Sequence, residues 1–276
     1  MCLLFSVCKR GDFIMTDRKL RNVTVKRKFD LTPNMLRIVL TGDDLKDFPV
    51  GQESAYIKLL FVSDSVKPTM RTYTIRKFDL ASLELTVDFV VHGVNNNSPQ
   101  PQEQIGPAIS WASNVEVGEQ ITIDGPGPVK LIDSSAEWVF FAGDMTAIPA
   151  ITVNIEQLPE ATKGHVVLEI LSASDKYPIE APAGVNIHWV INDTPNQKNS
   201  VLIEAVKSIR WFDGAPHIWV ASEFNAMRSL RRYFKESFAE RKLTINRGQI
   251  YASSYWKIGA TDEGNKASKK LDNENV

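Results

Sequence analysis

WVFFAGDMTAIPAI, the stretch from Trp138 to Ile151, marks the point at which the folding pattern of this 276-residue chain changes. Its first six residues are a continuous apolar run of strand length, and the residues after Gly143 have the apolar spacing of a helix. An apolar strand followed by a helix is typical of a parallel sheet that helices cover on both faces. The stretch therefore predicts that an α/β domain begins here.

The residues that follow continue this alternation. Apolar strands are expected over 165–173, 185–191 and 217–223, helices over 200–209 and 223–238, and a last short strand over 248–256. We therefore predict a parallel α/β domain of the nicotinamide-nucleotide-binding kind over residues 131–259. The polar residues 260–276 are expected to form a disordered tail.

The residues before this domain have the pattern of strands instead. Six segments have strand length and composition and are separated by Gly and Pro turns: 22–29, 35–42, 55–62, 71–78, 83–92 and 119–126. They predict a six-stranded antiparallel barrel over residues 20–130. A short helix is expected after Gly106, with Pro107 in its first turn. Residues 1–19 are expected to be a flexible extension.

The composition excludes several classes of function. Lys and Arg number 32 and Asp and Glu 33, so the net charge of −1 argues against nucleic acid or an anionic membrane as partner. Cys2 and Cys8 lie in the first ten residues and the four histidines are scattered, which argues against a disulfide framework and a metal site. No secretory signal or membrane-spanning run is recognisable, and we expect a cytoplasmic protein.

Two turns are candidate anion sites. Gly143 and Asp144 end a strand before a helix that Thr146 opens, where free backbone amides favour a phosphate or a polar ligand. The alternative is a tight turn at Gly143 with a capping residue after it. His92 ends another strand shortly before the helix at Gly106, which could receive a pyrophosphate, although a single histidine there is as often structural.

The segment RTYT, Arg71–Thr74, is unusual for a strand because neither of its faces is apolar. An exposed edge strand with solvated arginines is the simplest interpretation. A barrel followed by a nucleotide-type domain, however, is an arrangement that suits a flavin and a nicotinamide meeting at the domain interface. In such an arrangement, a polar strand of the barrel could contact the bound flavin.

Five motifs in order resemble one known family. They are RTYT at 71–74, DFVVHG at 88–93, GPAISWA at 106–112, AGDMTAIPAI at 142–151 and YWKIG at 255–259. Together they resemble the siderophore-interacting proteins, FAD-containing ferric-siderophore reductases related in architecture to ferredoxin-NADP reductases. The resemblance extends from about residue 21 to residue 259, nearly the whole chain.

The resemblance implies roles for individual residues. Arg71 would pair with the FAD pyrophosphate, Tyr73 would stack on the isoalloxazine and Thr74 would hydrogen-bond near its N5 edge, which makes Tyr73 and Thr74 the expected catalytic positions. The other FAD-binding positions implied are Thr72, Asp88, His92, Gly93, Ala108, Trp111 and Ala112. The nicotinamide-binding positions implied are Gly143, Asp144, Thr146, Ala147, Pro149 and Glu223.

Three positions depart from the family pattern. Ile109 stands where the family usually has Ser, which removes one hydroxyl contact to phosphate, and Met145 replaces a Glu after Gly-Asp. Ser222 replaces the Gly of a late Ala-Gly-Glu and adds a Cβ where a close approach of another backbone is expected.

The substrate end is expected to be basic, since ferric siderophores are often anionic. The resemblance places Lys58 and Lys257 around the iron-chelate pocket, and Lys130 is a weaker candidate; each could instead be a solvated surface lysine. Arg228, Arg231 and Arg232 most simply form the outer face of an amphipathic helix.

The resemblance thus implies an NAD(P)H-dependent, FAD-containing ferric-siderophore reductase whose partner is a ferric siderophore. Two alternatives remain open: a general flavin-dependent reductase with a protein or quinone acceptor, and a non-catalytic siderophore carrier. The residues do not choose between NADH, NADPH and reduced ferredoxin as donor. Ser174 and Lys176 could receive a 2′-phosphate, whereas Asp175 would oppose one.

Overall fold

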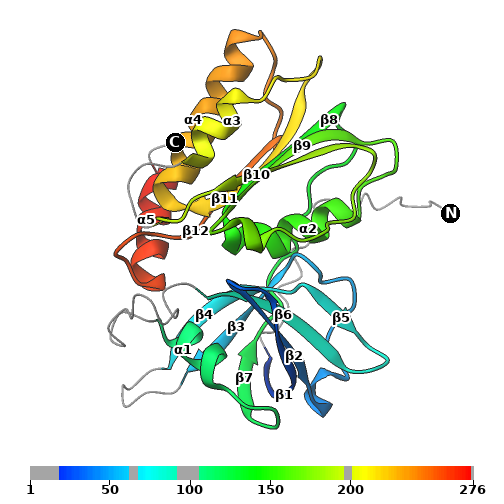
Figure 1. Ribbon diagram of the computed structural model, residues 1–276, viewed down its shortest axis with the longest axis vertical. Coiled ribbons are helices and arrows are strands. Elements are labelled where there is room, and N and C mark those ends of the chain that lie inside the picture. Colours follow the sequence, from blue (N-terminus) through cyan, green and yellow to red (C-terminus); the bar gives the residue numbers. More distant parts are fainter. Residues whose placement is uncertain (1–18, 62–67, 92–105, 196–200, 275–276) are drawn as a thin grey trace, which may run out of the picture.

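The chain forms two sheets, stacked one above the other in Figure 1. The computed structural model describes residues 19–61, 68–91, 106–195 and 201–274. An antiparallel sheet comes first in the chain and a parallel sheet flanked by helices comes second, which confirms the predicted fold class. The predicted flexible extension lies outside the described residues except for Lys19.

The first sheet has seven strands in the order β4-β3-β7-β1-β2-β6-β5, and helix α1 accompanies it. The strands are β1 (Leu20–Thr32), β2 (Met35–Thr41), β3 (Tyr56–Phe61), β4 (Thr69–Thr74), β5 (Lys77–Asp79), β6 (Glu84–Val90) and β7 (Gln120–Asp124). Helix α1 spans Pro107–Asn114, as its Gly-Pro start predicted, and a 3-10 turn, η1, covers Asp43–Leu45.

The seventh strand corrects the prediction of six. The stretch expected as one strand contains both edges of the sheet, β4 and β5, with only Ile75 and Arg76 between them. The Ile75 amide donates to the Ala55 carbonyl at 2.9 Å, while the Arg76 amide donates to Thr86 of β6 at 3.0 Å. The sheet therefore curls until its edges meet at Ile75, which is fully buried in the barrel core.

The second sheet is parallel, with strand order β10-β9-β8-β11-β12. Its strands are β8 (Trp138–Gly143), β9 (Lys163–Ile170), β10 (Gly184–Ile191), β11 (Pro216–Glu223) and β12 (Ile250–Trp256). Helix α2 (Ile148–Glu156) covers one face, and α3 (Val201–Ser208) and α4 (Phe224–Glu240) cover the other. The chain order reverses between β8 and β11, and ligands of such sheets bind outside the carboxyl ends at this switch point.

The C-terminal tail corrects a second prediction. Residues expected to be disordered form helix α5 (Asp262–Glu274), which lies beside β12 and α4. Asp272 of α5 is buried and accepts hydrogen bonds or ion pairs from Arg228 at 2.8 Å and Arg231 at 2.6 Å. These two α4 arginines therefore hold another helix instead of facing only solvent.

A buried carboxylate joins the two domains. Asp175, after β9, accepts from the Thr32 hydroxyl at 2.8 Å, the Asn34 amide N–H at 3.0 Å and the Asn34 side chain at 2.9 Å. It is 1 % exposed and faces the barrel, so the suggestion that it opposes a 2′-phosphate is wrong. A second link pairs Arg76 with Glu156 of α2.

Candidate functional site

Asp144 is at the centre of the switch point, directly after β8. One carboxylate oxygen accepts from the Thr146 amide at 3.0 Å and the Thr146 hydroxyl, and the other from the Glu223 amide and the Trp256 indole, both at 2.8 Å. Burial raises the pKa of Asp144 despite these bonds. The carboxylate thus caps the turn η3 (Met145–Ala147) and links β8 to the ends of β11 and β12.

Glu223 and Ser222 end the neighbouring strand β11. The Glu223 carboxylate accepts from the first amides of α4, Asn225 at 2.6 Å and Ala226 at 3.1 Å, and from the Ile258 amide at 3.3 Å. Ser222, one of the departures, is fully buried and donates to the Glu223 carbonyl at 3.3 Å. Its added Cβ is therefore accommodated inside the protein.

The remaining predicted nicotinamide positions belong to the turn and helix after β8. Thr146 is half-buried, whereas Ala147 and Pro149 are buried. Met145, a second departure, is 5 % exposed and packs in the core beneath α2. Only Asp144 and Glu223 of the predicted set also line the cavity at this edge of the sheet.

This cavity has a volume of about 120 Å³ and shows a residue that the sequence analysis missed. Glu169, near the end of β9, lines it with Asp144, Asn192 and Glu223. Burial raises the pKa of Glu169 to about 7, opposed by hydrogen bonds from the Asn192 side chain and the Leu202 amide. A single acidic residue inside the apolar run VVLEI was the available signal.

Strand β4 carries the RTYT residues on an edge of the barrel. Tyr73 lies 4.3 Å from the Phe89 ring between centroids, and the Arg71 guanidinium donates to the Met70 carbonyl at 2.9 Å. Thr72 is exposed, and Thr74 is hydrogen-bonded to the Tyr255 phenol of β12, whose pKa burial raises well above its usual range. Since Trp256 next to Tyr255 binds Asp144, β4 and the switch point lie together at the domain interface.

The α1 residues predicted to follow the flavin are mostly core residues. Ala108 and Ala112 are 3 % and 0 % exposed, and Trp111 packs its ring between Phe61 and Phe89. Ile109, the third departure, is half-buried. These side chains fix α1 on the barrel, and its Gly106 end remains the part that can meet a phosphate.

Three further predicted positions remain. Both oxygens of Asp88 on β6 accept from Arg37 on β2, at 2.7 and 2.8 Å, so this buried carboxylate joins two barrel strands. His92 and Gly93 lie outside the described residues.

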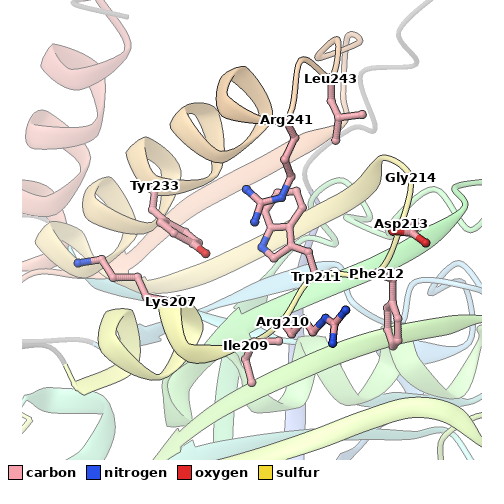
Figure 2. A pocket seen from close by; sticks show the side chains of 10 residues that line it. All are labelled: Lys207, Ile209, Arg210, Trp211, Phe212, Asp213, Gly214, Tyr233, Arg241 and Leu243. Carbon is pink, nitrogen blue, oxygen red and sulfur yellow. The ribbon is translucent and has the colours of Figure 1, made fainter.

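A larger cavity, of about 490 Å³, lies at the opposite edge of the parallel sheet. Figure 2 shows it between the end of α3, the loop before β11 and the end of α4, with Arg241 over the Trp211 ring. None of the predicted site residues line it. Since the strands begin here, this cavity lies away from the edge at which such sheets bind nucleotides.

Comparison with known proteins shows to which family the chain belongs. Residues 136–259 match the family model described as siderophore-interacting protein, and residues 24–130 match the siderophore-interacting FAD-binding domain in two overlapping segments. The ferric vibriobactin reductase ViuB of Vibrio cholerae is 33% identical, over 87% of this chain and 89% of the relative. The chain belongs to the siderophore-interacting protein family.

Solved structures agree with this assignment. A siderophore-interacting protein from Aeromonas hydrophila has a TM-score of 0.78 at 29% identity, covering 93% of this chain and 99% of that one. A ferredoxin-NADP+ reductase from Plasmodium falciparum, at 11% identity and a TM-score of 0.58, shares the fold over 83% of this chain and 95% of that one. Within the described residues, no helix is long and apolar enough to cross a membrane.

The residues of this siderophore-interacting protein fit FAD. Arg71 is partly exposed, and the one carboxylate that pairs with it among the described residues, Glu263 of α5, is 3.9 Å away on an exposed side chain. A pyrophosphate can therefore approach the guanidinium. As an edge strand, β4 also has backbone groups that pair with no neighbouring strand, next to the Tyr73 ring.

The three predicted substrate lysines lie on separate segments. Lys58 on β3 is opposite Thr72 of β4. Lys257, after β12, donates to Ser268 of α5 at 2.8 Å and lies 4.8 Å from the Phe224 ring. The Lys130 side chain is exposed. The backbone carbonyl of Lys130 accepts a hydrogen bond from the Trp219 indole at 2.9 Å, so this residue is held in place through its backbone.

Proposed function

We propose that this protein is a cytoplasmic ferric-siderophore reductase that passes electrons from a nicotinamide nucleotide through FAD to Fe(III) held by a siderophore. The meeting of β4 with the carboxyl edge of the parallel sheet is the observation that supports it most directly, through the Thr74–Tyr255 contact and the Trp256–Asp144 bond. It supports the proposal because the strand that would hold the flavin adjoins the turn that would receive the nucleotide.

The chain's own residues would bind and orient the reactants. Arg71 would neutralise the pyrophosphate of FAD, the Tyr73 ring would lie against the flavin plane, and the Thr74 hydroxyl would stand at its reactive edge. Bound FAD would accept two electrons from the nicotinamide and release them singly. Nicotinamide would enter past Asp144 and Glu223, with Thr146, Ala147 and Pro149 shaping the turn beneath it.

The names of relatives support the iron substrate. Besides ferric vibriobactin reductase, a ferric acinetobactin reductase from Acinetobacter baumannii is 25% identical over 71% of this chain. Hard oxygen chelators hold Fe(III) better than Fe(II), so reduction favours release of the metal. Lys58 and Lys257 would attract an anionic complex to the barrel side of the interface.

The test is an anaerobic spectroscopic titration of the purified protein. We expect a bound flavin whose absorbance bleaches with NADH or NADPH and returns when a ferric siderophore is added. A flavin that is bleached by reduced ferredoxin but by neither nucleotide would identify ferredoxin as the electron donor instead. A flavin that the ferric complex does not reoxidise would favour a general electron-transfer enzyme, and a protein that binds the iron complex but no FAD would favour a carrier.

A further inference from the structure

The cavity at the switch point is acidic. Three carboxyl groups, those of Asp144, Glu169 and Glu223, line it together with two carboxamides, two hydroxyls and the Trp256 indole. None of the described residues that line it is Lys, Arg or His. Such a lining hydrogen-bonds sugar hydroxyls or amides and repels a phosphate, because like charges at close distance oppose binding.

Two of these carboxyl groups are already occupied. Asp144 accepts from four donors and Glu223 from three backbone amides, so both are needed to hold the ends of β8, β11 and β12. In the described part of the chain, the partners of Glu169 are the Asn192 side chain and the Leu202 amide. A carboxyl group has about four lone-pair positions, so Glu169 is the group with capacity for a ligand.

The position of Glu169 in the sheet suggests which ligand. Strand β9 is the first strand reached from β8 on the side away from β11, and Glu169 is its penultimate residue. In doubly wound dinucleotide-binding folds, an acidic residue at the end of this strand receives the ribose 2′-hydroxyl of NAD, whereas an Arg there accommodates a 2′-phosphate.

We propose that this cavity receives ribose hydroxyls of the nicotinamide nucleotide and that Glu169 selects NADH over NADPH. The inference rests on the proposed function and names its electron donor. Among the described residues that line the cavity, a 2′-phosphate placed here would meet three carboxyl groups and no cation, whereas a free 2′-hydroxyl would donate to Glu169.

The selection should depend on pH. Since the pKa of Glu169 is about 7, its ionised form, which accepts from a hydroxyl and repels phosphate, becomes dominant above that pH. Asp144, directly after β8, and Glu223 of β11 are the other titratable groups among the described residues that line the cavity. The 2′-phosphate itself ionises near about pH 6, so a variant of Glu169 is needed to separate the two titrations.

The test measures NAD+ and NADP+ binding by calorimetry, at about pH 6 and about pH 8 on either side of the Glu169 pKa. We expect the FAD-loaded wild type to prefer NAD+ by about tenfold or more at the higher pH and by less at the lower. Glu169→Gln should bring the two affinities together and remove most of the pH dependence. Glu236→Gln, on the exposed side of α4, is the charge-matched control and should behave as wild type.

Equal binding of the two nucleotides, a preference for NADP+, binding of neither, or an unchanged ratio in Glu169→Gln would each overturn the inference. The preference of the wild type for NAD+ over NADP+ is itself a test, and it does not require the variant to fold. Reoxidation of dithionite-reduced flavin by a ferric siderophore needs no nucleotide. Electron transfer from the flavin to the ferric siderophore can therefore be confirmed even if the NADH preference is wrong. In the same way, the NADH preference can be confirmed even if the siderophore does not reoxidise the flavin.

Discussion

Arg71 is the residue on which the flavin proposal depends most. Its guanidinium is partly exposed, and its nearest carboxylate partner in the described part of the chain is an exposed glutamate at 3.9 Å. Exposed ion pairs of this kind contribute little to folding. The side chain can therefore be changed with little effect on the barrel.

Arg71→Ala should weaken FAD binding by about 10- to 100-fold, the loss expected for charge-assisted hydrogen bonds to a pyrophosphate. Fluorescence titration of the apoprotein with FAD measures it. Arg27→Ala is the control, because Arg27 is an exposed barrel arginine paired with Glu84 on another surface. An unchanged FAD affinity in Arg71→Ala would remove the main support for our account of RTYT.

Gly143 lies where the neighbouring atoms leave too little space for a Cβ. A Cβ added there would lie 2.7 Å from the Ala147 Cβ and from the Ile151 Cδ1, and 2.9 Å from the Ala221 carbonyl. Gly143→Ala should therefore destabilise the protein by about 1–3 kcal/mol through overpacking. Urea unfolding tests this, with Gly106→Ala as control, since no atom of the described residues lies within 4 Å of a Cβ there.

At the scale of elements, helix α5 shows what the sequence could not predict. Its composition is strongly polar, and the rule that such segments lack the apolar surface to fold led to an expectation of disorder. The helix is held instead by polar contacts: Asn265 binds Ser254 at 2.7 Å, and Asp272 meets Arg228 and Arg231. These depend on groups distant in sequence, which local composition does not reveal.

Asp272→Asn should loosen helix α5. Removing the charge leaves two arginines with a neutral partner in a largely buried position, and hydrogen bonds to charged groups are worth about 1.5–3 kcal/mol. We expect amide exchange over residues 262–274 to become roughly 10- to 100-fold faster. Lys270→Gln, at an exposed position of the same helix, should leave exchange unchanged. Equal exchange in both variants would contradict the role given to Asp272.

For the other elements too, features with a local sequence pattern were predicted, whereas features that depend on distant parts of the chain were missed. Apolar runs such as WVFFAG predicted their strands because burial on both faces leaves a local pattern, and Pro107 predicted the start of α1. The break at Ile75 was missed because a bend between two sheet edges depends on closure of the whole sheet. Glu169 was missed because its environment is created by β8, β10 and α3 together.

At the scale of the whole molecule, the proposed electron transfer requires the two domains to keep their relative position. One buried carboxylate contributes to this, since Asp175 accepts three hydrogen bonds from the barrel residues Thr32 and Asn34. Burial alone would raise the pKa of Asp175, but the bonds from Asn34 and Thr32 lower it below its usual range. The carboxylate is therefore ionised and holds the interface at neutral pH.

Asp175→Asn keeps the shape but loses part of the accepting capacity, which leaves barrel donors unsatisfied. We expect a loss of about 1.5–3 kcal/mol and a melting temperature lower by roughly 3–12 °C. A lowered folded-state pKa contributes stability that is complete above the unfolded value of about 3.9 and is lost as pH falls through the folded value. The difference between wild type and variant should thus be constant from about pH 5 to 8 and shrink only below about pH 4. Glu180→Gln, at an exposed position nearby in sequence, is the control. A difference that shrank near neutral pH would mean that another group, not the Asp175 carboxylate, holds the domains together.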